Sequence, residues 1–150
     1  MSIDYSIGRA SEREVSTHLF RCDDAFIPSL SSRVDIADYA RKIVDNAQTF
    51  EAWVNDELVG LVAVYCNASD RHTAFITSVS VLYGWQGKGI AGQLMAQCFD
   101  HLQALDLACS ELEVGTDNEA ALYLYKKLGF TIICKNGNTH KMTKVLTKDY

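Results

Sequence analysis

The segment Gln86-Gly87-Lys88-Gly89-Ile90-Ala91-Gly92 decides how the fold of this chain is interpreted. It follows a β-branched and aromatic run at residues 73–81, which predicts a strand, and it precedes a helical pattern that extends to about Ala104. Glycine lets the backbone turn so that successive N–H groups approach a ligand closely, and a helix start adds the positive end of its dipole. A glycine loop between a strand and a helix therefore favours a phosphate or pyrophosphate site.

The same glycines also fit a second pattern. Gly87, Gly89 and Gly92 match the G-x-G-x-x-G of dinucleotide-binding domains, and Glu111 and Glu113 follow at the spacing of a ribose-binding acid. Such a domain normally continues through further parallel strand-helix units, whereas only one more unit follows here before a hairpin. A nucleotide-triphosphate loop is absent, because the chain has no G-x-x-x-x-G-K-[ST]. A dinucleotide-binding oxidoreductase fragment is kept as the less favoured alternative.

The size and composition of the chain predict one domain over residues 1–150. It has 150 residues, of which 48% are hydrophobic and 22% charged, which is enough for a single core. No apolar run reaches the roughly 18 residues of a membrane helix, and the first residues lack a secretory signal pattern. Five cysteines without a C-x-x-C pair favour reduced thiols over disulfides or zinc. We therefore expect a cytoplasmic domain with no metal and no membrane partner.

The charge of the chain is −5, which argues against a nucleic-acid-binding surface. The charge is unevenly distributed: residues 1–70 carry 12 acidic and 6 basic side chains, whereas residues 71–150 carry 7 and 8. The second half therefore suits an anionic ligand, and the first half suits a cationic one.

Hydrophobic spacing and capping residues predict the other elements. Helices are expected at about residues 11–20, 35–47, 90–104 and 116–127, with Ser11 and Thr116 as capping residues. Strands are expected at residues 50–54, 58–65, 73–81, 110–114, 130–134 and 141–146. This order, with hairpins next to each other, predicts an α/β fold of the α+β type, in which about four helices flank a mixed, mostly antiparallel central sheet.

Two motifs make the sequence similar to the GNAT N-acetyltransferase superfamily. The family's pyrophosphate loop, Q/R-x-x-G-x-G/A, is matched by residues 86–91, after the approach V-x-x-x-Y/W-Q at residues 81–86. A second motif, N-x-x-A-x-x-x-Y-x-x-x-G-F, is matched in full by Asn118, Ala121, Tyr125, Gly129 and Phe130. The resemblance implies one GNAT-like domain, with an acceptor side in about residues 1–70 and an acetyl-CoA-binding half in about residues 71–150.

The resemblance also implies an activity: direct transfer of an acetyl group from acetyl-CoA to a primary amine in a ternary complex. The acceptor would be an amino sugar or another small amine, and the tyrosine of the second motif, Tyr125, would be the general acid. The backbone of the strand before the loop would bind the pantetheine arm, and the loop would bind the pyrophosphate. The cofactor-binding residues implied are Val79, Ser80, Val81, Gln86, Gly87, Lys88, Gly89, Ile90, Ala91, Asn118 and Tyr125.

The general base has no clear candidate, because the strand at residues 74–79 lacks the glutamate that some family members carry. Glu51, Asp70 and His72 are weak candidates, and an ordered water is another. Asp23, Asp24 and Phe26 are the expected substrate-binding residues, since they lie in the irregular segment around the single proline. The spacing of His18 and His101 suggests no metal, and helical surface positions explain both.

Two alternatives within the family remain open: a protein N-terminal or lysine acetyltransferase, and a non-catalytic acetyl-CoA-binding module. The presence of Tyr125 and Asn118 speaks against the second. Sheet edges in such small domains often pair, so a homodimer is also considered.

Overall fold

The computed structural model describes residues 2–66 and 72–146, which form a seven-stranded mixed sheet with helices on both faces. The strands are β1 (Asp4–Ile7), β2 (Gln48–Val54), β3 (Glu57–Tyr65), β4 (Thr73–Val81), β5 (Cys109–Gly115), β6 (Thr131–Asn136) and β7 (Thr139–Val145). The helices are α1 (Glu12–Arg21), α2 (Ile36–Asn46), α3 (Ile90–Ala104) and α4 (Glu119–Lys127). Three short 3-10 turns are η1 (Asp23–Ala25), η2 (Leu30–Ser32) and η3 (Tyr83–Trp85).

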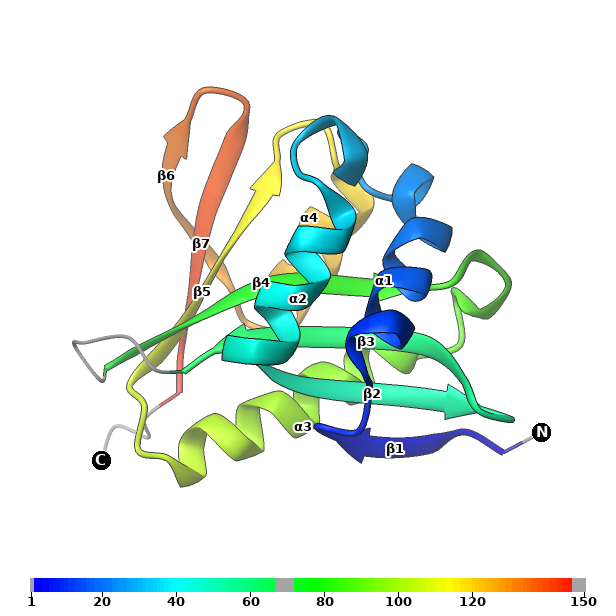
Figure 1. Ribbon diagram of the computed structural model, residues 1–150. Helices are drawn as coiled ribbons and strands as arrows, with labels where there is room; N and C mark the ends of the chain where they lie inside the picture. The colour runs from blue at the N-terminus through cyan, green and yellow to red at the C-terminus, as the bar shows by residue number, and fades with distance from the viewer. Residues whose placement is uncertain (1, 67–71, 147–150) are drawn as a thin grey trace.

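The strand order is β1-β2-β3-β4-β5-β7-β6, in which β4 and β5 are parallel and the other neighbouring pairs are antiparallel. Helices α1 and α2 cover one face, and α3 and α4 lie behind the sheet (Figure 1). Helix α1 begins with the predicted capping box, in which the Ser11 side chain accepts from the Glu14 N–H and the Glu14 carboxylate accepts from the Ser11 N–H. Leu19 and Ile43 of these two helices are fully buried in one hydrophobic cluster with Leu61 of β3.

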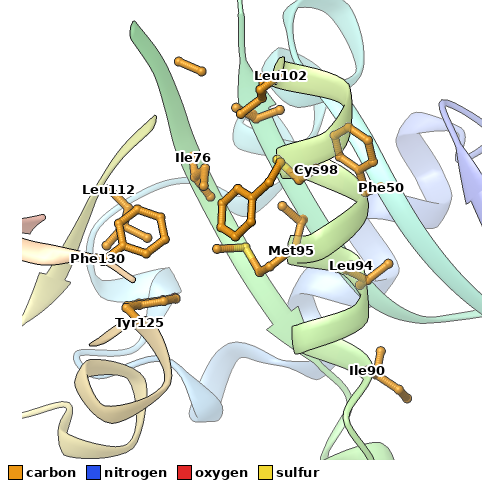
Figure 2. Packing of buried hydrophobic residues seen from close by; sticks show 14 of the residues in the cluster. Phe50, Ile76, Ile90, Leu94, Met95, Cys98, Leu102, Leu112, Tyr125 and Phe130 are labelled. Carbon is orange, nitrogen blue, oxygen red and sulfur yellow. The ribbon is translucent and has the colours of Figure 1, made fainter. Parts of the chain in front are cut away.

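The larger core lies on the opposite face, between the sheet, α3 and α4. The predicted spacing of α3 is confirmed, since Leu94, Cys98 and Leu102 recur every four residues and are fully buried. Figure 2 shows these α3 side chains facing the sheet, with Tyr125 and Phe130 packed together nearby. The packing fixes α4 and the start of α3 relative to β4.

Strands β4 and β5 pair over only three residues, and this produces the most important feature of the fold. The parallel pairing ends at Phe75 and Glu111. Beyond that point β4 continues along β3 to Val81, whereas β5 continues along β7 to Gly115. The edges of the two strands that face each other are therefore open where the strands diverge.

A bulge lies in β4 where this divergence begins. In the pairing with β3, Ala63 is opposite Ser78 and Val64 is opposite Ile76, so Thr77 is the extra residue. An extra residue reverses the alternation of a strand. As a result Ile76, before the bulge, and Val79, after it, both pack in the larger core.

The fold class expected from the sequence is confirmed, with four helices on a mixed, mostly antiparallel sheet. Two local predictions were wrong. Strand β1 was not predicted, because only its pairing with β2 defines this four-residue element. The N-cap of α4 is Asn118 rather than Thr116, because the Asn118 side chain accepts from the Ala121 N–H at 3.3 Å. In the described part of the chain, no helix has the length and apolar character to cross a membrane.

Candidate active site

A cavity of about 440 Å³ lies between the diverging halves of β4 and β5. Residues 76–81 of β4 and 112–115 of β5 line it, together with one side of α4. At one end it is bordered by residues 25–27 and by Arg33, which belong to the connection between α1 and α2. The start of α3 borders the other end through Gln86, Gly87 and Ala91. We call these the acceptor end and the glycine-loop end of the cavity.

Backbone amides dominate the glycine-loop end. Gly87 and Gly89 have φ values of +76° and +78°, and an added Cβ on either residue would contact nothing within 4 Å. Glycine is therefore needed there for its conformation rather than for space. Gly89 is the N-cap of α3 and offers no side-chain cap. Among the described residues, no acceptor is bound to the amides of Gly87 to Gly92, so this helix start can bind an anion.

The open edge of β4 leads away from this loop. Val79, Ser80 and Val81 pair with β3 on one side and line the cavity on the other. Strand edges have unpaired N–H and C=O groups that suit a ligand containing amides. The Gln86 side chain donates to the Val81 carbonyl at 3.2 Å, which connects the loop to the end of the strand.

Helix α4 brings both residues of the second motif to the cavity. Asn118 and Tyr125 line it, one at the helix start and one near its end. The Tyr125 ring packs edge-on against Phe130 with centroids 5.9 Å apart, and only 8% of the residue is exposed (Figure 2). Burial raises the pKa of Tyr125 to about 12. Burial is the sole cause of this shift, with no hydrogen bond from a described residue contributing, so the hydroxyl stays protonated and can donate to a ligand in the cavity.

Three residues of the predicted cofactor set do not line the cavity with their side chains. Ile90 is 1% exposed and belongs to the larger core, although its amide is at the helix start. Lys88 and Gly89 are exposed loop residues. The other predicted cofactor residues all line the cavity.

The acceptor end is formed by the irregular segment between α1 and α2. The carboxylate of Asp23 accepts from the Ser31 N–H at 2.7 Å and from the Ser31 hydroxyl at 2.6 Å, and these bonds lower the pKa of Asp23. An added Cβ on Gly115 would lie 2.7 Å from the Ile27 carbonyl oxygen, so this segment crosses β5 in close contact. Asp23 therefore shapes the segment, and Asp24 is exposed outside the cavity lining. Of the three predicted substrate residues, only Phe26 lines the cavity.

The two candidate bases within the described residues, Glu51 and His72, do not line the cavity. Glu51 is fully buried and accepts hydrogen bonds from the N–H groups of Arg9 and Ala10 and from the side chains of Thr49 and Trp53. The bonds from Arg9 and Ala10 attach the connection between β1 and α1 to β2, and those from Thr49 and Trp53 lie within β2, so the carboxylate has a structural role. His72 is exposed and does not line the cavity. Asp70 lies outside the described residues.

The cavity lining contains two charged residues, Arg33 and Glu113, that were not predicted for an acetyl-transfer site. Glu113 was named only in the dinucleotide alternative, as a ribose-binding acid. Glu113 lies on the face of β5 opposite the buried Leu112 and Val114. Lys141 is its register partner on β7, but the Lys141 ammonium binds Glu111 at 3.2 Å instead. The alternation of residues 110–114 was a usable signal, because it places Glu113 on one face of β5.

His18 is buried rather than on the surface, which corrects the sequence interpretation. It is 2% exposed, its Nδ1 lies 2.9 Å from the Leu58 carbonyl, and its Nε2 lies 2.9 Å from the Ser80 hydroxyl. A carbonyl only accepts, so Nδ1 carries the proton and Nε2 accepts from Ser80. Burial lowers the pKa of His18 to about 4. The neutral ring thus joins α1 to the cavity-lining strand β4.

All five cysteines are free in the structure. Among residues 2–66 and 72–146, no group of three or more His, Cys, Asp or Glu side chains is arranged to hold a metal ion.

Comparisons with known proteins agree with this geometry. A family model described as the acetyltransferase (GNAT) family matches residues 14–130. An uncharacterized N-acetyltransferase of Methanocaldococcus jannaschii is 33% identical over 85 residues, which are 54% of this chain and 38% of that protein. The mycothiol acetyltransferase of Streptomyces scabiei is 35% identical over 86 residues, which are 57% of this chain and 28% of that protein. The chain thus matches well under half of the length of each of these curated relatives.

A similar fold occurs in a solved structure, the PaiA N-acetyltransferase of Thermoplasma acidophilum in complex with coenzyme A. The two structures superpose with a TM-score of 0.77 at 16% sequence identity, over 97% of this chain and 99% of that one.

Proposed function

Because the chain belongs to the acetyltransferase (GNAT) family, we propose that it transfers the acetyl group of acetyl-CoA to a primary amine of a small molecule. The observation that carries this proposal is the cavity between β4 and β5, with an uncapped helix start at one end and Tyr125 in its wall. The transfer would be direct, with both substrates bound in the cavity together.

The glycine-loop end fits the anionic part of acetyl-CoA. The free amides from Gly87 to Ala91 would bind the pyrophosphate, and the dipole of α3 adds favourable charge. The open edge of β4 at residues 79–81 would pair with the amides of the pantetheine arm. Asn118 uses its side-chain oxygen to cap α4, so its amide nitrogen would donate to the same arm. Holding the thioester beside the acceptor is the main contribution to rate in such a transfer.

Tyr125 would donate a proton to the sulfur of CoA as the bond to the acetyl carbon breaks. The raised pKa of this phenol, about 12, keeps it protonated throughout the neutral range, so it acts as a donor rather than a base. Glu113 is the carboxylate among the described residues that line the cavity, whereas Glu51 and His72 do not line it. Glu113 is therefore the candidate general base. It would attract the ammonium form of the acceptor and accept its proton, directly or through water.

The volume of the cavity favours a small acceptor. Small-molecule sites have volumes of roughly 300–1,000 Å³, and the 440 Å³ here must hold both the end of the pantetheine arm and the amine. The segment at Ile27, in close contact with Gly115, covers the acceptor end on one side.

Calorimetric titration tests the proposal, with acetyl-CoA and NADH added to separate samples. We expect micromolar binding of acetyl-CoA, no binding of NADH, and release of free CoA when amines are added. A protein that binds acetyl-CoA but releases no CoA with any of the amines would instead be a non-catalytic binding module. Binding of NADH alone would support the dinucleotide interpretation of the glycine loop and contradict the proposal.

A further inference from the structure

We propose that the acceptor amine also carries a carboxylate, which Arg33 binds while Glu113 binds the ammonium group. The acceptor would then be an amino acid or a close derivative of one. This inference rests on the function proposed above and names the substrate class for the same cavity.

The charge of the cavity lining is the first support. Among the described residues that line it, Arg33 is the cation and Glu113 is the anion, and the other lining side chains are neutral. Neither residue forms an ion pair with another described residue. Lys141, the register partner of Glu113, binds Glu111 instead. A cavity with one charge of each sign complements a molecule with one charge of each sign.

The position of Arg33 is the second support. Tyr39 of α2 donates its hydroxyl hydrogen to the Thr77 carbonyl at 2.6 Å, and the Thr77 hydroxyl lies 2.7 Å from the Tyr39 hydroxyl oxygen. Arg33 lines the same cavity as Thr77 and Ser78, the two residues at the bulge of β4 where the strands begin to diverge. Burial raises the pKa of Tyr39, and the positive charge of Arg33 opposes part of that shift.

This position separates Arg33 from the proposed pyrophosphate site. Thr77 and Val81 are four residues apart on β4, which corresponds to about 13 Å in an extended strand. The glycine loop lies beyond Val81, so its amides are farther still from the bulge. Arg33 therefore faces the end of the cavity that receives the acceptor rather than the phosphates of CoA.

A carboxylate is the anion that fits this environment best. The planar guanidinium can form two parallel hydrogen bonds to a carboxylate, and a single guanidinium balances its single negative charge. A phosphate monoester carries nearly two charges at neutral pH, and the described residues of the lining include no second cation. An aminophosphate acceptor is therefore less favoured, and the experiment includes one.

The experiment compares matched pairs of acceptors that differ only in the carboxylate. L-Phenylalanine is compared with phenethylamine, L-histidine with histamine and L-arginine with agmatine, and glucosamine 6-phosphate serves as the aminophosphate. Release of free CoA gives kcat/KM for each compound. The wild-type protein is expected to prefer the carboxylate member of at least one pair by roughly tenfold to a hundredfold, the strength of a charged hydrogen-bonded contact.

Arg33→Gln is expected to remove this preference by lowering kcat/KM for the amino acid while leaving the decarboxylated amine unchanged. Arg33→Lys should retain part of it. The matched control is Arg41→Gln, since Arg41 pairs with Asp38 on α2 and does not line the cavity. The affinity for acetyl-CoA should be the same in all four proteins.

Several outcomes would overturn the inference. These are a preference for the decarboxylated amines, an equal loss for both members of a pair in Arg33→Gln, a preference for glucosamine 6-phosphate, or no turnover of any pair by a protein that binds acetyl-CoA. Failure of the wild-type protein to bind acetyl-CoA is a different result, because it contradicts the proposed function itself.

Discussion

The two ends of the cavity are constructed in different ways. The glycine-loop end consists mainly of backbone: the amides at the start of α3 and the open edge of β4. The acceptor end consists of side chains from distant parts of the sequence, among them Phe26, Arg33 and Glu113. A backbone site binds what all members of a family share, whereas a side-chain site can differ from one member to the next. We infer that the first end holds the common substrate and the second selects the acceptor.

Tyr125 lines the cavity from near the end of α4, and its replacement should have the largest effect on activity. Tyr125→Phe removes the proton donor and keeps the ring that packs against Phe130. We expect kcat to fall roughly a hundredfold or more, with the affinity for acetyl-CoA and the melting temperature unchanged. Steady-state kinetics and calorimetry on the variant check this. An unaltered kcat would remove Tyr125 from the mechanism.

His18 joins α1 to the cavity-lining strand β4 through Ser80, and it should make folding stability depend on pH. Its pKa is about 4 in the folded protein and near the ordinary 6.5 in the unfolded chain, so the unfolded chain binds more protons between these values. The stability from neutral His18 is present above pH 6.5 and is lost as the pH falls toward 4. The loss should be about 2 to 3 kcal/mol.

Urea unfolding at a series of pH values measures this effect, with His18→Gln as the comparison. Glutamine keeps a donor and an acceptor but does not titrate, so the variant should lose less stability than the wild-type protein between pH 6.5 and 4. Parallel pH profiles for the two proteins would show that His18 does not have the low pKa on which the prediction depends.

Gly89→Val should weaken the glycine-loop end alone. A β-branched residue is strained at φ +78°, by about 1–2 kcal/mol, and the strain would move the amides at the start of α3. We expect the Kd for acetyl-CoA to rise about tenfold while the KM for the amine changes little. Gly92→Ala is the matched control, because its Cβ would contact nothing within 4 Å. Equal affinities in the two variants would contradict the assignment of the pyrophosphate site.

Glu113→Gln should weaken the acceptor end, with an effect similar in size to that of Gly89→Val at the other end. We expect kcat/KM for the amine to fall about tenfold, because an exposed carboxylate shares proton transfer with solvent. The Kd for acetyl-CoA should not change. Glu111→Gln is the control, since Glu111 binds Lys141 and does not line the cavity. A drop of the same size in both variants would show a general charge effect instead of a role for Glu113.

The contrast between the ends also explains what the sequence could predict. The glycine loop and the Asn118 to Phe130 motif are local patterns, and they reach the cavity because strand, loop and helix follow one another along the chain. The residues of these patterns that line it are Gln86, Gly87, Ala91, Asn118, Ala121 and Tyr125. The irregular segment was expected to border a site because of its proline and serines, and Phe26 does so. The paired placement of Arg33 and Glu113 depends on β4 and β5 diverging after three residues, which no local pattern encodes.

Burial of polar side chains was the other property that the sequence concealed. Glutamate is a residue type usually found on the surface, yet Glu51 is buried and accepts hydrogen bonds from residues 9, 10, 49 and 53. His18 did carry a signal, because Val15, Leu19 and Cys22 lie on the same face of α1 at spacings of three and four. A histidine on that face can be buried in the core when both of its ring nitrogens have hydrogen-bond partners, as those of His18 do.

The most direct test of this account is calorimetric titration of acetyl-CoA into three proteins: wild type, Gly89→Val and Arg33→Gln. The account predicts micromolar binding to the wild-type protein, the same affinity in Arg33→Gln, and about tenfold weaker binding in Gly89→Val. Acetyl-CoA binding that is weakened in Arg33→Gln as much as in Gly89→Val would contradict the division of the cavity into two ends.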